Sequence, residues 1–132
     1  MKPRYYLATA LYCAFIFWMS NQSHPPGAEI DFEGSDKVAH FLVYGVLAGI
    51  ISIGMHRAPQ MHPFWLRLVV PPTFALIFGV SDEIHQLFTP NRTFSAMDML
   101  ADGLGAVVAQ GLCLYIFRIR PNLMLQEEQG TS

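Results

Sequence analysis

The sequence predicts an all-α integral membrane protein: a four-helix bundle with its N-terminus and C-terminus in the cytoplasm. Three observations lead to this prediction. The 132 residues are 52% hydrophobic and only 14% charged, whereas an average soluble domain is roughly 25% charged. Four apolar stretches approach the length of a membrane span. If the chain crosses the membrane four times, most of its basic residues lie on the same side of the membrane.

The first helix is predicted over about residues 5–20. Lys2 and Arg4 precede it, as in a secretory signal peptide, but no small-residue cleavage site follows and the stretch is rich in bulky aromatic residues. We therefore expect a helix that is retained in the mature protein. The second helix is predicted over about residues 36–55, after an outer loop that contains proline and glycine.

The third helix is predicted over about residues 63–88 and the fourth over about residues 96–118. In hydrocarbon every backbone N–H and C=O group must be hydrogen-bonded, and a helix achieves this within a single segment. The connections are short, so consecutive helices should be antiparallel neighbours. Together the helices form one transmembrane domain, residues 1–120, and a polar cytoplasmic tail follows at 121–132.

The charges predict the orientation of the bundle. Cytoplasmic loops of membrane proteins carry an excess of lysine and arginine. With both termini inside, only Lys37 and Arg92 lie outside, together with most of the acidic residues, among them Glu29, Asp31 and Glu33. The remaining basic residues are then cytoplasmic: Lys2, Arg4, Arg57, Arg67, Arg118 and Arg120.

Small residues predict where helices approach closely. Gly45 and Gly49 form a GxxxG pair in the second helix, and Gly105 and Ala109 form a similar pair in the fourth. Small side chains let two backbones come together, which matters in lipid because burial of apolar surface no longer drives helix association.

Polar residues recur at helical spacing near the predicted outer ends of three helices. Residues three or four apart share one face of a helix. Charged groups at this depth are costly and normally face the bundle interior or a wet cavity. We therefore expect one shared polar site, with Arg92 as a counter-ion from the adjoining loop. The members of this polar site are Asp36, His40 and Tyr44 on the second helix, Asp82, Glu83, His85 and Gln86 on the third, and Asp98 and Asp102 on the fourth.

Some of these residues have a purely structural interpretation. Ser35 could cap the second helix, and Ser95 with Asp98 resembles a capping box for the fourth. Lys37 could extend to the membrane interface, and Tyr44 could be a core aromatic residue. His40, Gln86 and Asp102 are harder to explain in this way, because an unpaired polar group about one turn deeper costs several kcal/mol.

Three linked motifs resemble the VanZ-like family of small bacterial multi-pass membrane proteins. They are Asp36-Lys37-x-x-His40-Phe41-x-x-Tyr44, Asp82-Glu83-x-x-Gln86-x-Phe88-x-Pro90-x-Arg92 and Asp98-x-x-x-Asp102-x-x-Gly105. The resemblance covers almost the whole chain, although Asp102 stands where the family often has asparagine. It implies a location in the bacterial inner membrane and a link to resistance against a glycopeptide antibiotic, teicoplanin, and hence to the cell envelope. The polar positions carried over are Asp36, Lys37, His40, Tyr44, Asp82, Glu83, Gln86, Arg92, Asp98 and Asp102.

Three functions fit these residues. In the first, the site binds or modulates a cell-envelope lipid or a lipid-linked cell-wall precursor, contacted by Lys37, Tyr44, Gln86, Arg92, Asp98 and Asp102. In the second, the protein is an intramembrane hydrolase or transferase acting on a lipid-linked phosphate or ester. His40 and Asp36 would then be its acid–base pair, and Asp82 or Glu83 a second carboxylate. In the third, the polar residues only hold the helices together or form part of a larger assembly.

The sequence predicts no cofactor and no metal, because no ligand spacing is diagnostic. Metal binding by His40, His85 and the carboxylates is an alternative within the enzymatic hypothesis. The net charge of -2 gives no general attraction to nucleic acid, so none is expected as a partner. The oligomeric state does not follow from the sequence.

Overall fold

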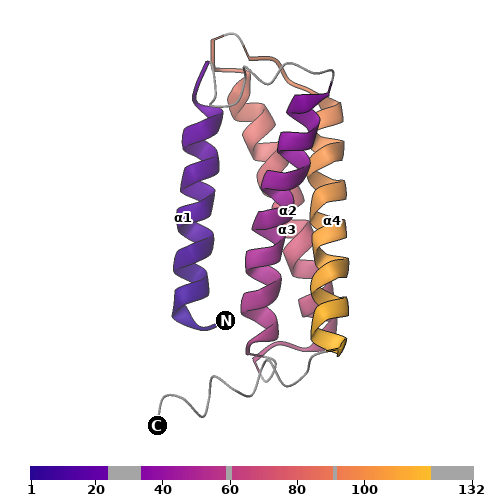
Figure 1. Ribbon diagram of the computed structural model, residues 1–132. Coiled ribbons are helices and arrows are strands. Elements are labelled where there is room, and N and C mark those ends of the chain that lie inside the picture. Colours follow the sequence, from indigo (N-terminus) through magenta and orange to yellow (C-terminus); the bar gives the residue numbers. More distant parts are fainter. Residues whose placement is uncertain (24–33, 59–60, 91, 120–132) are drawn as a thin grey trace.

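The computed structural model describes residues 1–23, 34–58, 61–90 and 92–119, and these residues form four α-helices and short connections. The helices alternate in direction, so the start of α1 and the end of α4 lie at the same end of the molecule (Figure 1). The prediction of an all-α four-helix architecture is confirmed. The helices are α1 (Pro3–Ser20), α2 (Ser35–His56), α3 (Phe64–Gln86) and α4 (Ala96–Ile119).

The helix boundaries lie within a few residues of those predicted. α3 ends at Gln86, two residues before the expected end at Phe88, because the chain turns there. α2 begins at Ser35, and the preceding cap residue is Gly34 with a φ of 90°. The expectation that Ser35 itself caps α2 is therefore wrong. Glycine suits the cap position because it adopts this left-handed backbone conformation without steric cost.

α2, α3 and α4 are each long and apolar enough to cross a membrane. Their 22 to 24 residues correspond to about 33–36 Å at 1.5 Å per residue, slightly more than a hydrocarbon core of about 30 Å. α1 has 18 residues and is not among these three, since its tyrosines and Arg4 make it less apolar. Its crossing of the membrane stays a prediction.

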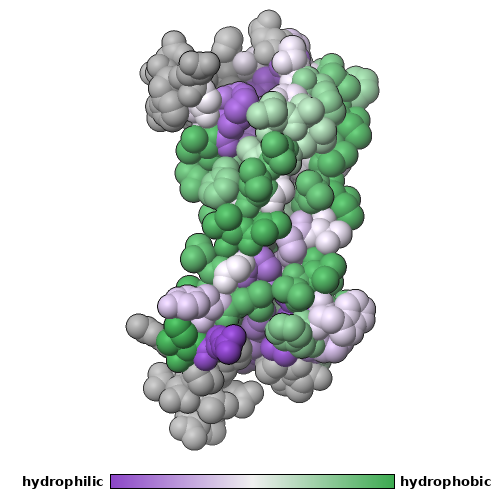
Figure 2. Space-filling model, turned by 90° about the vertical axis from the view of Figure 1, so that its right-hand side faces the viewer, coloured by the Kyte–Doolittle hydropathy of each residue, from purple (hydrophilic) through white to green (hydrophobic). Residues whose placement is uncertain are grey.

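The outer surface of the bundle suits a lipid environment. Leu7, Ile77 and Val107 are each 60% exposed or more. Hydrophobic residues cover most of the middle of the face in Figure 2, and hydrophilic residues gather toward its two ends. A surface of this kind exposes far more apolar area than a soluble monomer normally does.

The helices meet most closely where α2 crosses α4. A Cβ atom added to Gly105 would overlap the backbone carbonyl of Phe41, and one added to Gly45 would lie 3.1 Å from the Gly105 carbonyl oxygen. The predicted close approach is confirmed for these glycines. It is wrong for Gly49, beside which nothing lies within 4 Å. The adjoining core is formed mainly by Tyr44, Leu47, Ala48, Ile51, Ala75 and Ala106.

Apart from Lys37 and Arg92, the described basic residues lie at the end of the bundle opposite the predicted polar site. Lys2 and Arg4 begin α1, Arg57 follows α2, and Arg118 ends α4, all at the lower end of Figure 1. The start of α2, the end of α3 and the start of α4 lie at the upper end. The predicted tail at 121–132, Arg120 and the outer-loop acids Glu29, Asp31 and Glu33 lie outside the described residues.

Candidate functional site

Three helices bring ionisable side chains together at one end of the bundle. His40 lies in the second turn of α2, Glu83 in the last turn of α3, and Asp98 and Asp102 in the first two turns of α4. Glu83 and Asp102 are completely buried, Asp98 is 8% exposed, and the His40 side chain is 13% exposed. These four residues are called the acidic site below.

His40 is held by a carboxylate from the neighbouring helix. Its Nδ1 lies 3.0 Å from Asp102 Oδ1, within hydrogen-bonding distance. The expectation that His40 pairs with Asp36 is wrong. Asp36 lies in the exposed first turn of α2, where its carboxylate accepts a hydrogen bond from Lys37 Nζ at 2.9 Å. Because Asp102 holds Nδ1, the other imidazole nitrogen of His40, Nε2, is directed toward Glu83 and Asp98.

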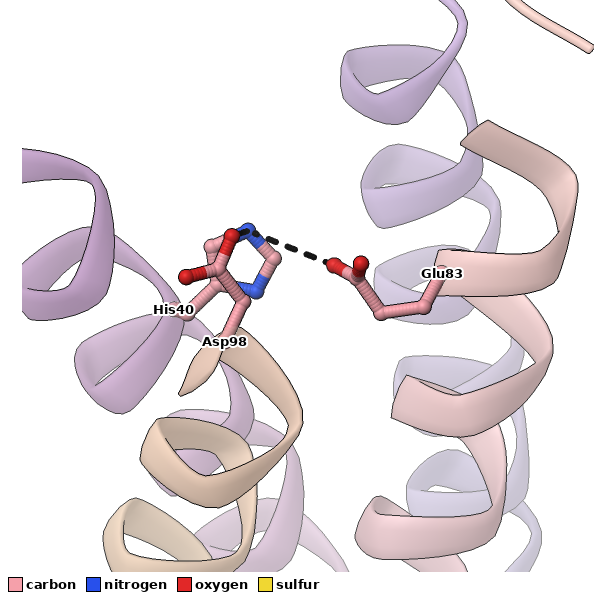
Figure 3. A group of neighbouring side chains, drawn as sticks. All are labelled: His40, Glu83 and Asp98. Carbon is pink, nitrogen blue, oxygen red and sulfur yellow. Dashed lines mark ion pairs between the residues drawn. The ribbon is translucent and has the colours of Figure 1, made fainter. Parts of the chain in front are cut away.

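His40, Glu83 and Asp98 point toward one another from α2, α3 and α4 (Figure 3). His40 Nε2 lies 3.8 Å from Asp98 Oδ2 and 4.0 Å from Glu83 Oε1. These distances exceed those of direct hydrogen bonds. The three groups thus surround a common point at ion-pair distances, without hydrogen bonds to one another.

Glu83 and Asp98 are each fixed from a second direction. The backbone N–H of Ser95 donates to Glu83 Oε2 at 2.8 Å. Lys37 Nζ lies 3.5 Å from Asp98 Oδ1. Ser95 also accepts a hydrogen bond at its Oγ from the Asp98 backbone N–H, at 3.2 Å, so the predicted Ser95 cap of α4 is confirmed. The reciprocal half of a capping box is not formed, because the Ser95 N–H donates to Glu83 and not to the Asp98 side chain. The start of α4 and the end of α3 are therefore joined through Ser95.

Arg92 reaches the carboxylates through an amide. Its Nε and Nη2 donate to Gln86 Oε1 at 3.3 and 3.1 Å, and Gln86 Nε2 donates to Asp82 Oδ2 at 3.1 Å. Within the described residues Arg92 is therefore not the direct counter-ion that the sequence suggested. Instead it fixes which end of the Gln86 amide faces Asp82. This arrangement places a charged group at the edge of the site and a neutral donor inside it.

The remaining predicted residues divide between the site and the core. Tyr44 is 1% exposed and its ring stacks on the His40 ring, with centroids 6.0 Å apart. Its hydroxyl group lies near the Asp82 and Asp102 carboxylates. His85 does not join the acidic site, because its ring lies 4.5 Å from that of Phe17 on α1. The alternative metal ligand set containing His85 is therefore not assembled.

The acidic site and its surroundings contain buried oxygen atoms without a hydrogen-bond partner. They are Asp82 Oδ1, Glu83 Oε1 and Asp102 Oδ2. Asp98 Oδ1 also lacks a hydrogen bond but lies 3.5 Å from Lys37 Nζ. An unsatisfied buried acceptor costs about 1–3 kcal/mol, and more when it is charged. A network built only to hold helices together would satisfy these atoms internally. Carboxylates placed in this way can accept protons, bind a cation or accept hydrogen bonds from a ligand.

Gly79 positions Asp102, a role that the sequence analysis missed. A Cβ atom at Gly79 would lie 2.5 Å from Asp102 Oδ2 and 3.1 Å from its Cγ, so only glycine leaves room for this carboxylate. The available signal was its spacing, because Gly79 lies three residues before Asp82 and shares its helix face.

The comparison with protein families gives one result. The model of the VanZ/LLP1 family matches residues 5–118. The chain belongs to the VanZ/LLP1 family. The match includes all four helices almost completely, and with them every residue of the acidic site. Neither the curated proteins nor the solved structures contain a match to this chain.

Proposed function

We propose that this VanZ/LLP1 protein binds the polar headgroup of a cell-envelope lipid or a lipid-linked cell-wall precursor at its acidic site. The observation that supports this most directly is the set of buried carboxylate oxygens without partners. Hydroxyl, amide or ammonium groups of a headgroup would donate hydrogen bonds to them. A purely structural network has no reason to leave such atoms unsatisfied.

The edge of the site carries the charge that a lipid phosphate requires. The Lys37 side chain is 41% exposed and lies beside Asp98, and Arg92 lies in the connection between α3 and α4. Charge-assisted hydrogen bonds from such cations are among the stronger contacts to phosphate oxygens. In this arrangement the cations contact the phosphate, while the buried carboxylates contact the donor groups of the headgroup.

The distribution of basic residues favours an extracytoplasmic location for the site. The described lysines and arginines other than Lys37 and Arg92 lie at the opposite end of the bundle, which the positive-inside rule assigns to the cytoplasm. Cell-wall precursors are exposed on the outer face of the bacterial inner membrane. A contribution to glycopeptide resistance fits this setting, because these antibiotics act on the same precursors.

An intramembrane hydrolase or transferase is a second candidate, and the geometry of His40 favours it. Its Nδ1 is held by Asp102 while Nε2 faces the centre of the site, which is how an orienting carboxylate presents a general base. Among the described residues, no hydrogen bond joins a serine or cysteine side chain to His40. The nucleophile would therefore be water or a group of the substrate.

Native mass spectrometry of the purified protein tests the proposal. We expect a co-purifying lipid with the wild-type chain and its loss with His40→Ala and Lys37→Ala. Arg118→Ala is the matched control, because it removes an exposed arginine from the other end of the bundle and should retain the lipid. Circular dichroism in detergent establishes that each variant is folded. Equal lipid retention by all variants, or a large loss of stability in His40→Ala, would support the structural role instead.

A further inference from the structure

We propose that His40, Glu83 and Asp98 bind a divalent transition-metal ion between α2, α3 and α4. One donor atom from each residue, an imidazole nitrogen and two carboxylate oxygens, lies within 4.8 Å of the other two. The three side chains come from three different helices and converge on one point (Figure 3). No metal was predicted from the sequence, and metal binding by His40, His85 and the carboxylates was only an alternative, because residues brought together by three helices show no characteristic spacing along the chain.

The distances suit an ion after a small closure of the site. Donors about 2.1 Å from a metal are roughly 3.0–3.4 Å apart in octahedral or tetrahedral geometry. The observed separations are 3.8 Å from His40 Nε2 to Asp98 Oδ2 and 4.0 Å to Glu83 Oε1. Changes of about half an ångström in these side chains therefore bring His40 Nε2 into range of each carboxylate, and the two carboxylate oxygens lie within 4.8 Å of each other.

Each ligand is oriented by a separate contact, as in established metal sites. Asp102 Oδ1 accepts from His40 Nδ1 at 3.0 Å and leaves Nε2 free to bind the ion. The Ser95 N–H holds Glu83 Oε2 and leaves Oε1 without a partner, although the Glu83 side chain is completely buried. This buried, unpaired oxygen faces the proposed ion. It is an independent indication of a ligand, beyond the clustering of acids.

The chemistry of the donors indicates the class of ion. A nitrogen donor with two carboxylates suits Zn²⁺ or Mn²⁺ better than Ca²⁺ or Mg²⁺, which prefer oxygen ligands alone. Three protein ligands leave at least one coordination position open. That position would accept a phosphate oxygen, which explains how an acid-rich site can bind an anionic headgroup. This last step rests on the function proposed above.

Metal binding by the full chain in detergent tests the inference. After treatment with EDTA and addition of Zn²⁺ or Mn²⁺, we expect one ion per chain by elemental analysis. Calorimetry should show affinity reduced at least about 100-fold in Glu83→Gln and His40→Ala, and about 10- to 100-fold in Asp102→Asn. Arg118→Ala is the control, since Arg118 is exposed at the opposite end of the bundle and lies outside the donor set. Its affinity should stay within a few-fold of the wild-type value.

Glu83→Gln guards against a trivial loss of folding, because glutamine can still accept the hydrogen bond from Ser95. No stoichiometric ion in the wild type, or wild-type affinity in Glu83→Gln, would overturn the metal site. If the protein retains lipid but binds no metal, the metal site is refuted and the proposed function stands. Metal bound tightly, with no lipid in the presence of the ion, would refute the phosphate step and the proposed function but not the site.

Discussion

Gly105 and Gly79 both allow a close approach in this bundle, and they serve different purposes. At Gly105 the neighbour is the backbone of α2, at the carbonyl of Phe41. At Gly79 the neighbour is the Asp102 carboxylate, 2.5 Å from the position of a Cβ atom. The first glycine lets two helices pack, whereas the second makes room for a polar side chain in the acidic site. Close packing thus serves stability in one region and positioning in the other.

The two regions also differ in how fully their polar groups are satisfied. The crossing of α2 and α4 is a contact of small residues and backbone, beside the hydrophobic core. The acidic site holds several buried acceptors without partners. Regions selected for function often retain such unfavourable arrangements, at the expense of stability. Removing a buried charge from the acidic site should therefore raise stability, whereas crowding either close contact should lower it.

The largest loss of stability is expected from Gly105→Ala. Because a backbone atom of Phe41 occupies the space of the new methyl group, the helices must separate. Overpacking of this kind costs about 3 kcal/mol in the free energy of unfolding. Denaturation in mixed detergent micelles, followed by circular dichroism, would measure it. A stability equal to that of the wild type would show that the crossing is not closely packed.

A smaller loss of about 1–2 kcal/mol is expected from Gly79→Ala, because the Asp102 side chain can rotate aside where a backbone cannot. The same rotation removes Asp102 from His40, so metal affinity should fall about 10- to 100-fold. Gly103→Ala is the control, since a Cβ atom there meets only the end of the Leu76 side chain, at 3.4 Å. Unchanged metal affinity in Gly79→Ala would contradict the positioning role.

Glu83→Gln should increase stability in the absence of metal by about 1 kcal/mol. It removes one of several neighbouring buried negative charges and adds a donor that can face Asp98. Thermal unfolding in detergent with EDTA gives the direction of the change. Destabilisation under these conditions would mean that the Glu83 charge is structurally required rather than kept for a ligand.

The smallest effect is expected from Gly49→Ala. Gly49 lies in the same helix as Gly45, but nothing is within 4 Å of a Cβ atom at this position. Alanine should stabilise the helix by about 0.5 kcal/mol through the reduced freedom of the unfolded backbone. The same denaturation experiment compares it with Gly105→Ala. A loss approaching that of Gly105→Ala would place Gly49 in an interface between copies of the chain.

Much of the fold could be predicted from the sequence. Apolar length identified the four helices, and spacings of three and four residues identified the polar faces that meet at one end. The pairing of His40 could not be predicted. His40 lies four residues after Asp36 on α2, which suggests a contact between them. In the structure Asp36 lies in the exposed first turn and bonds Lys37, and His40 instead bonds Asp102 of α4. Which partners meet depends on the rotation of each helix about its axis, and residue spacing does not report that rotation.

The GxxxG pattern illustrates the same limit. It predicted small residues on one face of α2, and Gly45 does contact α4, but Gly49 does not. Crossing helices approach closely over only a short length, so a repeated pattern marks a face rather than a contact point. Gly79 was missed for the converse reason, since its neighbour is a distant side chain and not part of any local repeat.

Ser95 links the acidic site to the stability of the first turn of α4. Its hydroxyl group caps α4, and its N–H group holds Glu83 at the end of α3. A ligand that moves the Glu83 side chain must therefore change the length of its hydrogen bond from the Ser95 N–H, just before the first turn of α4. Hydrogen–deuterium exchange at the Ser95 and Asp98 amides would then change with occupancy, because exchange reports local opening. Two backbone amides could in this way report binding without any label on the ligand.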